Sequence, residues 1–217
     1  MMTRSSGTPW YHAFSGRSIL AALPLTLLGL GATAETVEGL GTDPLLSSQD
    51  PQCVVAEQMP LEGRASPLES ASAEVGSATV MVCYGAPSAR GRTMIGGDDV
   101  PYGEFWRTGA NEPTMIHLTA PANVAGVQLE AGSYSLYTRP GNDEWDLFLN
   151  RSIDRWGIPI NAEVRAEEIG QATLPREQPE DHVETLQFRF EDVSGSQATL
   201  VLEWENYRVR IPVEVTG

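Results

Sequence analysis

The 217-residue chain contains no lysine, so all 14 of its basic residues are arginines. This absence excludes Schiff-base catalysis, the lysine of a phosphate-binding P-loop and a serine–lysine nucleophile pair. Against the arginines stand 29 acidic residues, which give a formal net charge of −15. Proteins bind nucleic acid and anionic membrane surfaces through clustered basic side chains, so neither is an expected partner of this acidic chain. A GC-rich genome explains the missing lysine, and a saline habitat explains the acidity; both explanations stay open.

Histidine is almost as scarce, with three residues in the chain. The H-E-x-x-H, G-x-S-x-G and strand-linked G-x-G-x-x-G patterns are also missing, which argues against zinc proteases, serine hydrolases and dinucleotide binding. His117 shares strand parity with Met115 and Thr119, whereas Glu112 has the opposite parity. The local spacing therefore builds no histidine–carboxylate ligand set. We predict no metal site, no cofactor and no assigned catalytic residue.

The chain also lacks an apolar run long enough to cross a bilayer. Residues 19–30 are apolar, but a spanning helix needs about 20 such residues. The run follows Arg4 and Arg17 and ends in Ala32-Thr33-Ala34, a pattern typical of a signal peptide cleaved before Glu35. We therefore expect residues 1–34 to be removed, leaving a secreted or periplasmic protein with no stable membrane span. An uncleaved N-terminal anchor is the alternative.

Two cysteines, Cys53 and Cys83, follow the predicted leader. An even count in an oxidising compartment predicts a disulfide, with two separate thiols as the alternative. Cys53 lies in residues 35–69, a stretch rich in glycine, proline, serine and acidic residues without periodicity, which we interpret as a flexible or loosely docked arm. The bond would tie this arm to a domain formed by residues 70–217.

Residues 70–217 show apolar residues at every second position, in short runs separated by turn residues. Such runs lie at 78–84, 114–119, 127–129, 133–139, 144–150, 186–190, 200–204 and 209–213. This pattern predicts an all-β fold, an antiparallel β-sandwich of jelly-roll-like or barrel-like form. Residues 160–169 are expected to form a short helical turn at most. Arg208 and Arg210 should point away from the core, and Pro212 suggests a sheet edge.

The segment Val100–Pro113 has the densest mixture of chemistry in the chain. It holds Tyr102, Trp106, Arg107, Asn111 and Glu112 between two prolines. An aromatic ring there can stack on a flat ligand, and a guanidinium can grip a carboxylate or phosphate with two hydrogen bonds. The alternative is that the aromatic rings fill the core while the polar groups satisfy the loop. Arg90 and Arg92, in the preceding loop, are expected neighbours of this candidate site.

Several motifs resemble an exported bacterial family catalogued as domain of unknown function 2911. They are Cys83–Arg92, Val100–Gly103, Trp106–Glu112, Gly132–Tyr137, Pro140-Gly141, Trp156-Gly157 and Leu202–Glu205. The resemblance covers about residues 64–215 and implies export and a mostly β domain. It implies no reaction and no catalytic residue.

Three functional hypotheses follow from these residues. The first is a non-catalytic binding module for a small polar or carbohydrate ligand, or for an envelope protein, centred on Trp106 and Arg107. The second is a carboxylate-dependent hydrolase that uses Glu112. The third is a purely structural envelope domain, in which Trp106 and Arg107 are both buried.

Overall fold

The computed structural model describes Cys53, Val55 and residues 61–217. Contacts divide the chain into residues 1–46 and 47–217, and every described residue belongs to the second part. The predicted leader, residues 1–34, lies outside the described residues, as does most of the predicted arm. No helix in the described part of the chain is long and apolar enough to cross a membrane.

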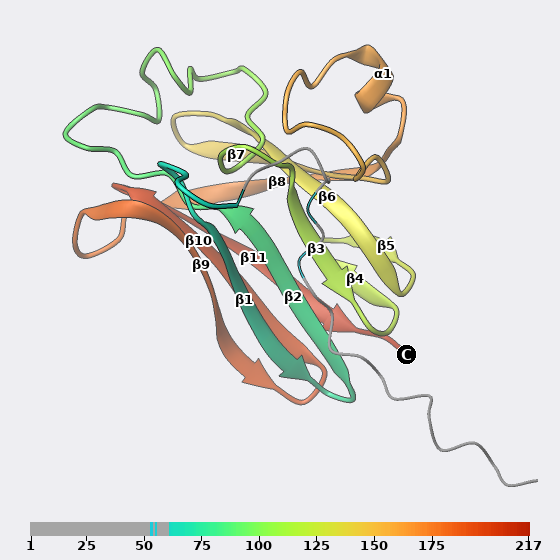
Figure 1. Ribbon diagram of the computed structural model, residues 1–217. Coiled ribbons are helices and arrows are strands. Elements are labelled where there is room, and N and C mark those ends of the chain that lie inside the picture. Colours follow the sequence, from blue (N-terminus) through green and yellow to red (C-terminus); the bar gives the residue numbers. More distant parts are fainter. Residues whose placement is uncertain (1–52, 54, 56–60) are drawn as a thin grey trace, which may run out of the picture. The chain divides into compact units, whose positions relative to one another are not determined.

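The described chain forms an antiparallel β-sheet with a single short helix (Figure 1). The strands are β1 (Leu68–Val75), β2 (Ala78–Gly85), β3 (Thr114–Leu118), β4 (Ala122–Val124), β5 (Val127–Leu129), β6 (Gly132–Pro140), β7 (Glu144–Asn150), β8 (Glu168–Glu177), β9 (Val183–Ser194), β10 (Gln197–Glu205) and β11 (Tyr207–Val215). The helix α1 (Ala162–Arg165) lies within the predicted helical turn, and the Asn161 side chain caps it by accepting from Val164 N at 3.1 Å.

The strands follow one another around a nearly closed sheet in the order β1-β2-β3-β6-β7-β8-β11-β10-β9, with β4 and β5 attached beside β11. The two ends of this order meet where the chain beyond β2 pairs with β9. There Ala89 N donates to Glu184 O and Leu186 N donates to Pro87 O, both at 2.9 Å. The predicted all-β antiparallel fold is confirmed, in its barrel-like form.

The core lies inside this curved sheet and is built from the alternating residues that the sequence indicates. In β10, for example, Leu200, Leu202 and Trp204 all point inward and are at most 1% exposed. A tight turn joins β1 to β2, and Gly76, at φ +63°, permits this hairpin. The sequence does not predict strand β8, because Leu174 is its one buried side chain and the apolar alternation is too weak to recognise.

Pro212 does not mark a sheet edge. Strand β11 lies inside the sheet, with β10 on one side and β8 followed by β4 on the other. The β8 pairing involves Arg208 and Val209, and the β4 pairing begins at Val213. Pro212 therefore lies where the neighbouring strand is interrupted, which explains how an interior strand accommodates it.

The predicted disulfide between Cys53 and Cys83 is present, with a Cα–Cα distance of 5.6 Å. Cys83 lies in β2, so the bond fixes Cys53 to the sheet. The two cysteines are 30 residues apart in the sequence, and in the chain-entropy model closing such a loop stabilises the fold by about 3–4 kcal/mol.

Charged side chains form a network on the outer face of β9, β10 and β11. Glu203 is 3% exposed and accepts hydrogen bonds from Arg189, Arg208 and Gln187. Arg210 donates to Glu191 at 2.6 Å. Arg208 and Arg210 thus point away from the core, as predicted. Burial opposes ionisation of Glu203, but the hydrogen bonds from Arg189 and Arg208 outweigh it and lower its pKa. The hydrogen bond from Arg210 lowers the pKa of Glu191.

Acidification should weaken the fold through this network. A carboxylate whose pKa is lower in the folded chain stabilises it fully above the unfolded value of 4.5 and loses that contribution as pH falls through the folded value. Burial also lowers the pKa of His117. The folded chain therefore begins to lose stability as the pH falls below 6.5, the ordinary pKa of histidine, before the carboxylates contribute. In urea titrations from neutral pH to about pH 3, Glu203→Gln should lose less stability below pH 4.5 than the parent chain. An acid slope unchanged from that of the parent would contradict this prediction, and Glu130→Gln, an exposed carboxylate, serves as the control.

Candidate functional site

Two loops emerge at the same end of the sheet, the long connection between β2 and β3 and the connection between β7 and β8 that carries α1 (Figure 1). The first contains all seven residues predicted as a ligand site. The second contains Trp156 and Gly157. Their contacts decide which side chains reach the surface.

Trp106 is part of the core. It is 7% exposed, and its backbone pairs with Thr138 of β6 through hydrogen bonds of 2.8 and 2.9 Å. Its ring stacks on that of Trp204, with centroids 5.5 Å apart, and meets the ring of Trp145 edge-on at 6.0 Å. The Trp106 ring is therefore packed against other core rings and closes this end of the barrel interior.

Glu112 and Asn111 hold the segment that leads into β1. The Glu112 side chain is 2% exposed and its Oε1 forms an ion pair with Arg64 Nη1 at 2.7 Å. Asn111, at φ +64°, donates from Nδ2 to Ser66 O at 3.1 Å. Residues 64–66, at the end of the predicted arm, are thus docked on the loop. Such a buried carboxylate does not face an open cleft, as a hydrolase would need.

The side chain of Arg107, from the first loop, reaches Gly157 of the second loop. It is partly buried, and its Nε is enclosed without a hydrogen-bond partner among the described residues. Burial lowers the pKa of its guanidinium, while the Glu112 carboxylate acts in the opposite direction. A Cβ added to Gly157 would lie 2.5 Å from Arg107 Cδ and 2.3 Å from Asn111 O. Gly157 N also donates to Asn111 O at 3.1 Å. The first loop therefore packs against the second at Gly157, and this contact requires glycine at position 157.

The remaining predicted site residues lie apart from this contact. Arg90 donates to Ala65 O, and Arg92 forms an exposed ion pair with Asp99 at 3.0 Å. The Tyr102 hydroxyl lies 2.5 Å from that of Tyr207. Burial and this hydrogen bond raise the pKa of Tyr102 to about 12. The structure therefore brings together Arg107, Asn111 and Glu112 but distributes Tyr102, Trp106, Arg90 and Arg92 over other contacts.

The second loop and α1 line a cavity of about 490 Å³ that the sequence analysis did not identify as a site. Its lining residues are Ser152, Asp154, Arg155, Trp156, Ile158, Pro159, Asn161, Glu163, Val164 and Glu167. Trp156 and Ile158 are each 49% exposed. The available signal was Trp156-Gly157, a motif shared with the resembled family, but the sequence does not show that this tryptophan is the exposed one.

Internal hydrogen bonds fix the backbone around this cavity. Arg155 donates to three backbone oxygens, those of Ser152, Trp156 and Gly157, at 3.0–3.2 Å. Burial lowers the pKa of its guanidinium. Asn150, which is fully buried, donates to Val164 O at 2.7 Å and accepts from Ser152 N at 2.7 Å. The loop and α1 are thereby held together, so hydrogen bonds within the chain define the walls of the cavity.

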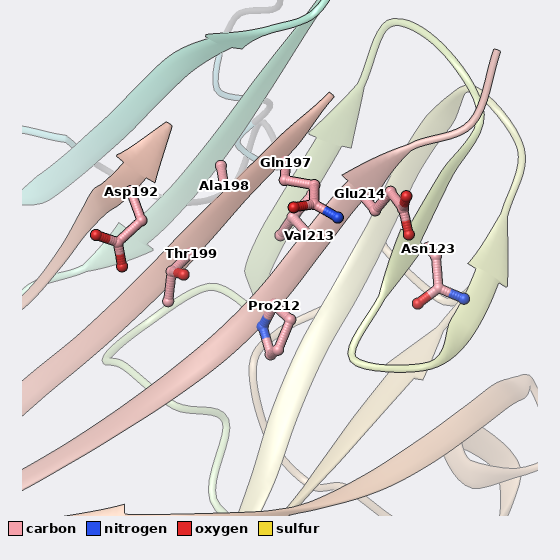
Figure 2. A pocket seen from close by; sticks show the side chains of 8 residues that line it. All are labelled: Asn123, Asp192, Gln197, Ala198, Thr199, Pro212, Val213 and Glu214. Atoms are coloured by element: carbon pink, nitrogen blue, oxygen red, sulfur yellow. The ribbon is translucent and has the colours of Figure 1, made fainter. Parts of the chain in front are cut away.

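A second cavity, of about 280 Å³, lies over the outer surface of β10 and β11 (Figure 2). Its polar side chains are spread along the strands, and it contains no aromatic residue. Asp192, at one end, is already paired with Arg210 at 2.5 Å. Among the described residues no group of three or more histidine, cysteine or acidic side chains is placed to hold a metal ion. This surface is the weaker candidate.

Comparison with known proteins gives one match. The family model described as protein of unknown function (DUF2911) matches residues 66–213. The chain belongs to this family. No curated protein and no solved structure matches. The resemblance noted from the sequence motifs is therefore confirmed. The matched residues of the DUF2911 domain include β1 to β10, β11 as far as Val213, and the β2–β3 and β7–β8 connections.

Proposed function

We propose that this DUF2911 domain is an exported, non-catalytic binding module whose cavity beside Trp156 takes a small polar ligand such as a sugar. The observation that carries the proposal is a half-exposed tryptophan on a fixed backbone at a cavity of suitable size. Ligand cavities typically measure about 300–1,000 Å³ and combine apolar walls with a few polar groups. The predicted leader and the disulfide support export, because disulfides persist in oxidising compartments.

The exposure of Trp156 is informative because of its cost. Fully burying a large apolar side chain stabilises a fold by roughly 1.5–3 kcal/mol, and an indole has an even larger area to bury. Trp106, Trp145 and Trp204 are at most 7% exposed, whereas Trp156 is 49% exposed. A flat ring that is held open beside a cavity has a surface available for a ligand. The burial of Glu112 leaves the hydrolase hypothesis without a comparable observation.

Substitution of Trp156 tests the proposal. Titration of the chain from Glu35 onward with glucose, glucosamine or glucuronic acid should shift the indole N–H resonance of Trp156 in a ¹H–¹⁵N spectrum. The resonance is assigned by its loss in Trp156→Phe. Trp156→Ala should weaken binding of the responding sugar at least tenfold while leaving the melting temperature nearly unchanged, since the ring is half-exposed.

Val193→Ala provides the matched control, because Val193 is an apolar side chain of similar exposure, 46%, on β9. This variant should bind as the parent does. Absence of any response at Trp156, or equal affinity in the parent and Trp156→Ala, would rule out the cavity as the binding site.

A further inference from the structure

The rim of the Trp156 cavity is acidic. Asp154, Glu163 and Glu167 all line it, and all three are exposed. None of them forms an ion pair within the part of the chain that the structure describes. They differ in this from Asp99, Asp146, Glu191 and Glu203, each of which has an arginine partner. Within the described residues, the rim thus presents three carboxylates that no ion pair neutralises.

The cavity's one lining cation, Arg155, does not balance them. Its Nε and Nη1 donate to loop carbonyls at 3.0–3.2 Å, and its Nη2 lies 3.4 Å from Ser135 Oγ. The guanidinium is thus used to hold the loop and faces the sheet. An anionic ligand would find three carboxylates and no guanidinium free to grip it.

The apolar wall of the cavity also favours a cationic ligand. The half-exposed ring of Trp156 lies with Ile158 and Pro159 along the same lining. A cation over the face of a tryptophan ring is attracted by the negative charge of the π system, and tryptophan is the best such partner. Carboxylates at the rim and an indole in the wall therefore favour the same kind of group.

We propose that the ligand carries a protonated amine, with amino sugars as its chemical class. This inference rests on the proposed function and adds the charge that the cavity selects. The ammonium group would face the carboxylates of Asp154, Glu163 and Glu167, and the apolar face of the sugar ring would lie against Trp156. The size of the cavity fits one such small molecule.

Three sugars that share one ring test the charge. Glucosamine is cationic, glucose is neutral and glucuronic acid is anionic at about pH 6, where a primary amine of this kind is protonated. With the Trp156 indole N–H as the reporter, glucosamine should bind at least about fivefold more tightly than glucose, and glucuronic acid most weakly. Added salt should reduce the preference, because ionic strength screens exposed charges.

Charge-neutral variants connect the preference to the rim. Glu163→Gln combined with Glu167→Gln should bring the affinity for glucosamine close to that for glucose, whereas Glu130→Gln, a single exposed carboxylate outside the cavity, should leave the preference intact. Equal affinities for glucosamine and glucose in the parent, or tighter binding of glucuronic acid, would overturn the charge selection and leave the binding proposal standing. No response of Trp156 to any of the three sugars would overturn both proposals.

Discussion

Trp106→Ala should lower the free energy of unfolding by about 3–5 kcal/mol, the range typical of removing a large aromatic side chain from a core. Trp106 stacks on Trp204 and meets Trp145 edge-on, so its loss leaves a cavity bounded by two indole rings that belong to different strands. Both of those rings are at most 1% exposed and have little freedom to collapse into the space. Urea denaturation with an unchanged m-value measures the effect.

Trp156→Ala is the matched control, because it is the same substitution at a ring that is 49% exposed. It should change the free energy of unfolding by less than about 1 kcal/mol, as exposed substitutions commonly do. The two variants thus separate the tryptophan that stabilises the fold from the tryptophan proposed to bind. Similar stability losses in both would contradict the assignment of Trp106 to the core and of Trp156 to the surface.

Glu112→Ala should also destabilise the domain by about 3–5 kcal/mol, the range expected when one partner of a buried ion pair is removed. Arg64 and Glu112 have side-chain exposures of 8% and 2%, so water screens their interaction little. The variant also removes the negative charge beside Arg107, whose guanidinium is already disfavoured by burial. The midpoint of urea denaturation measures the loss.

Asp99→Ala provides the control for this pair. Asp99 and Arg92 are bonded at 3.0 Å, but their side chains are 55% and 54% exposed. Exposed ion pairs contribute about 0–1 kcal/mol, so this variant should unfold close to the parent. A loss for Glu112→Ala no larger than that for Asp99→Ala would show that the Arg64–Glu112 pair does not hold the end of the arm in place.

The strands were predictable wherever one face is apolar and the other polar. Leu200, Leu202 and Trp204 alternate in this way, and the turn residues Gly76 and Gly195 separate the predicted runs. Strand β8 was not predictable, because its stabilisation comes from pairing with β7 and β11 rather than from its own buried side chains. The position of Pro212 was misjudged because the interruption between β8 and β4 is a property of the sheet and not of the strand.

The candidate site, like the strands, was predictable only in part from the sequence. The sequence located a loop dense in aromatic and charged residues, but Trp106 and Glu112 of that loop are buried and Arg107 supports Gly157. The sequence does not show which of these side chains are exposed to solvent. Nothing local distinguishes Trp106-Arg107-Thr108-Gly109 from Arg155-Trp156-Gly157, since both place a tryptophan beside an arginine and near a glycine.

The sequence by itself determined the all-β class, the disulfide between Cys53 and Cys83, the family, and the absence of lysine-based chemistry. These follow from residue identity, alternation and motif order, which are properties of the chain alone. Tertiary structure decided which tryptophan is buried and which is exposed, that Arg155 donates to loop carbonyls, and that Asp154, Glu163 and Glu167 line one cavity. Burial and charge pairing depend on residues far apart in sequence, such as Trp106 with Trp204 and Arg64 with Glu112, and only the folded chain brings them together.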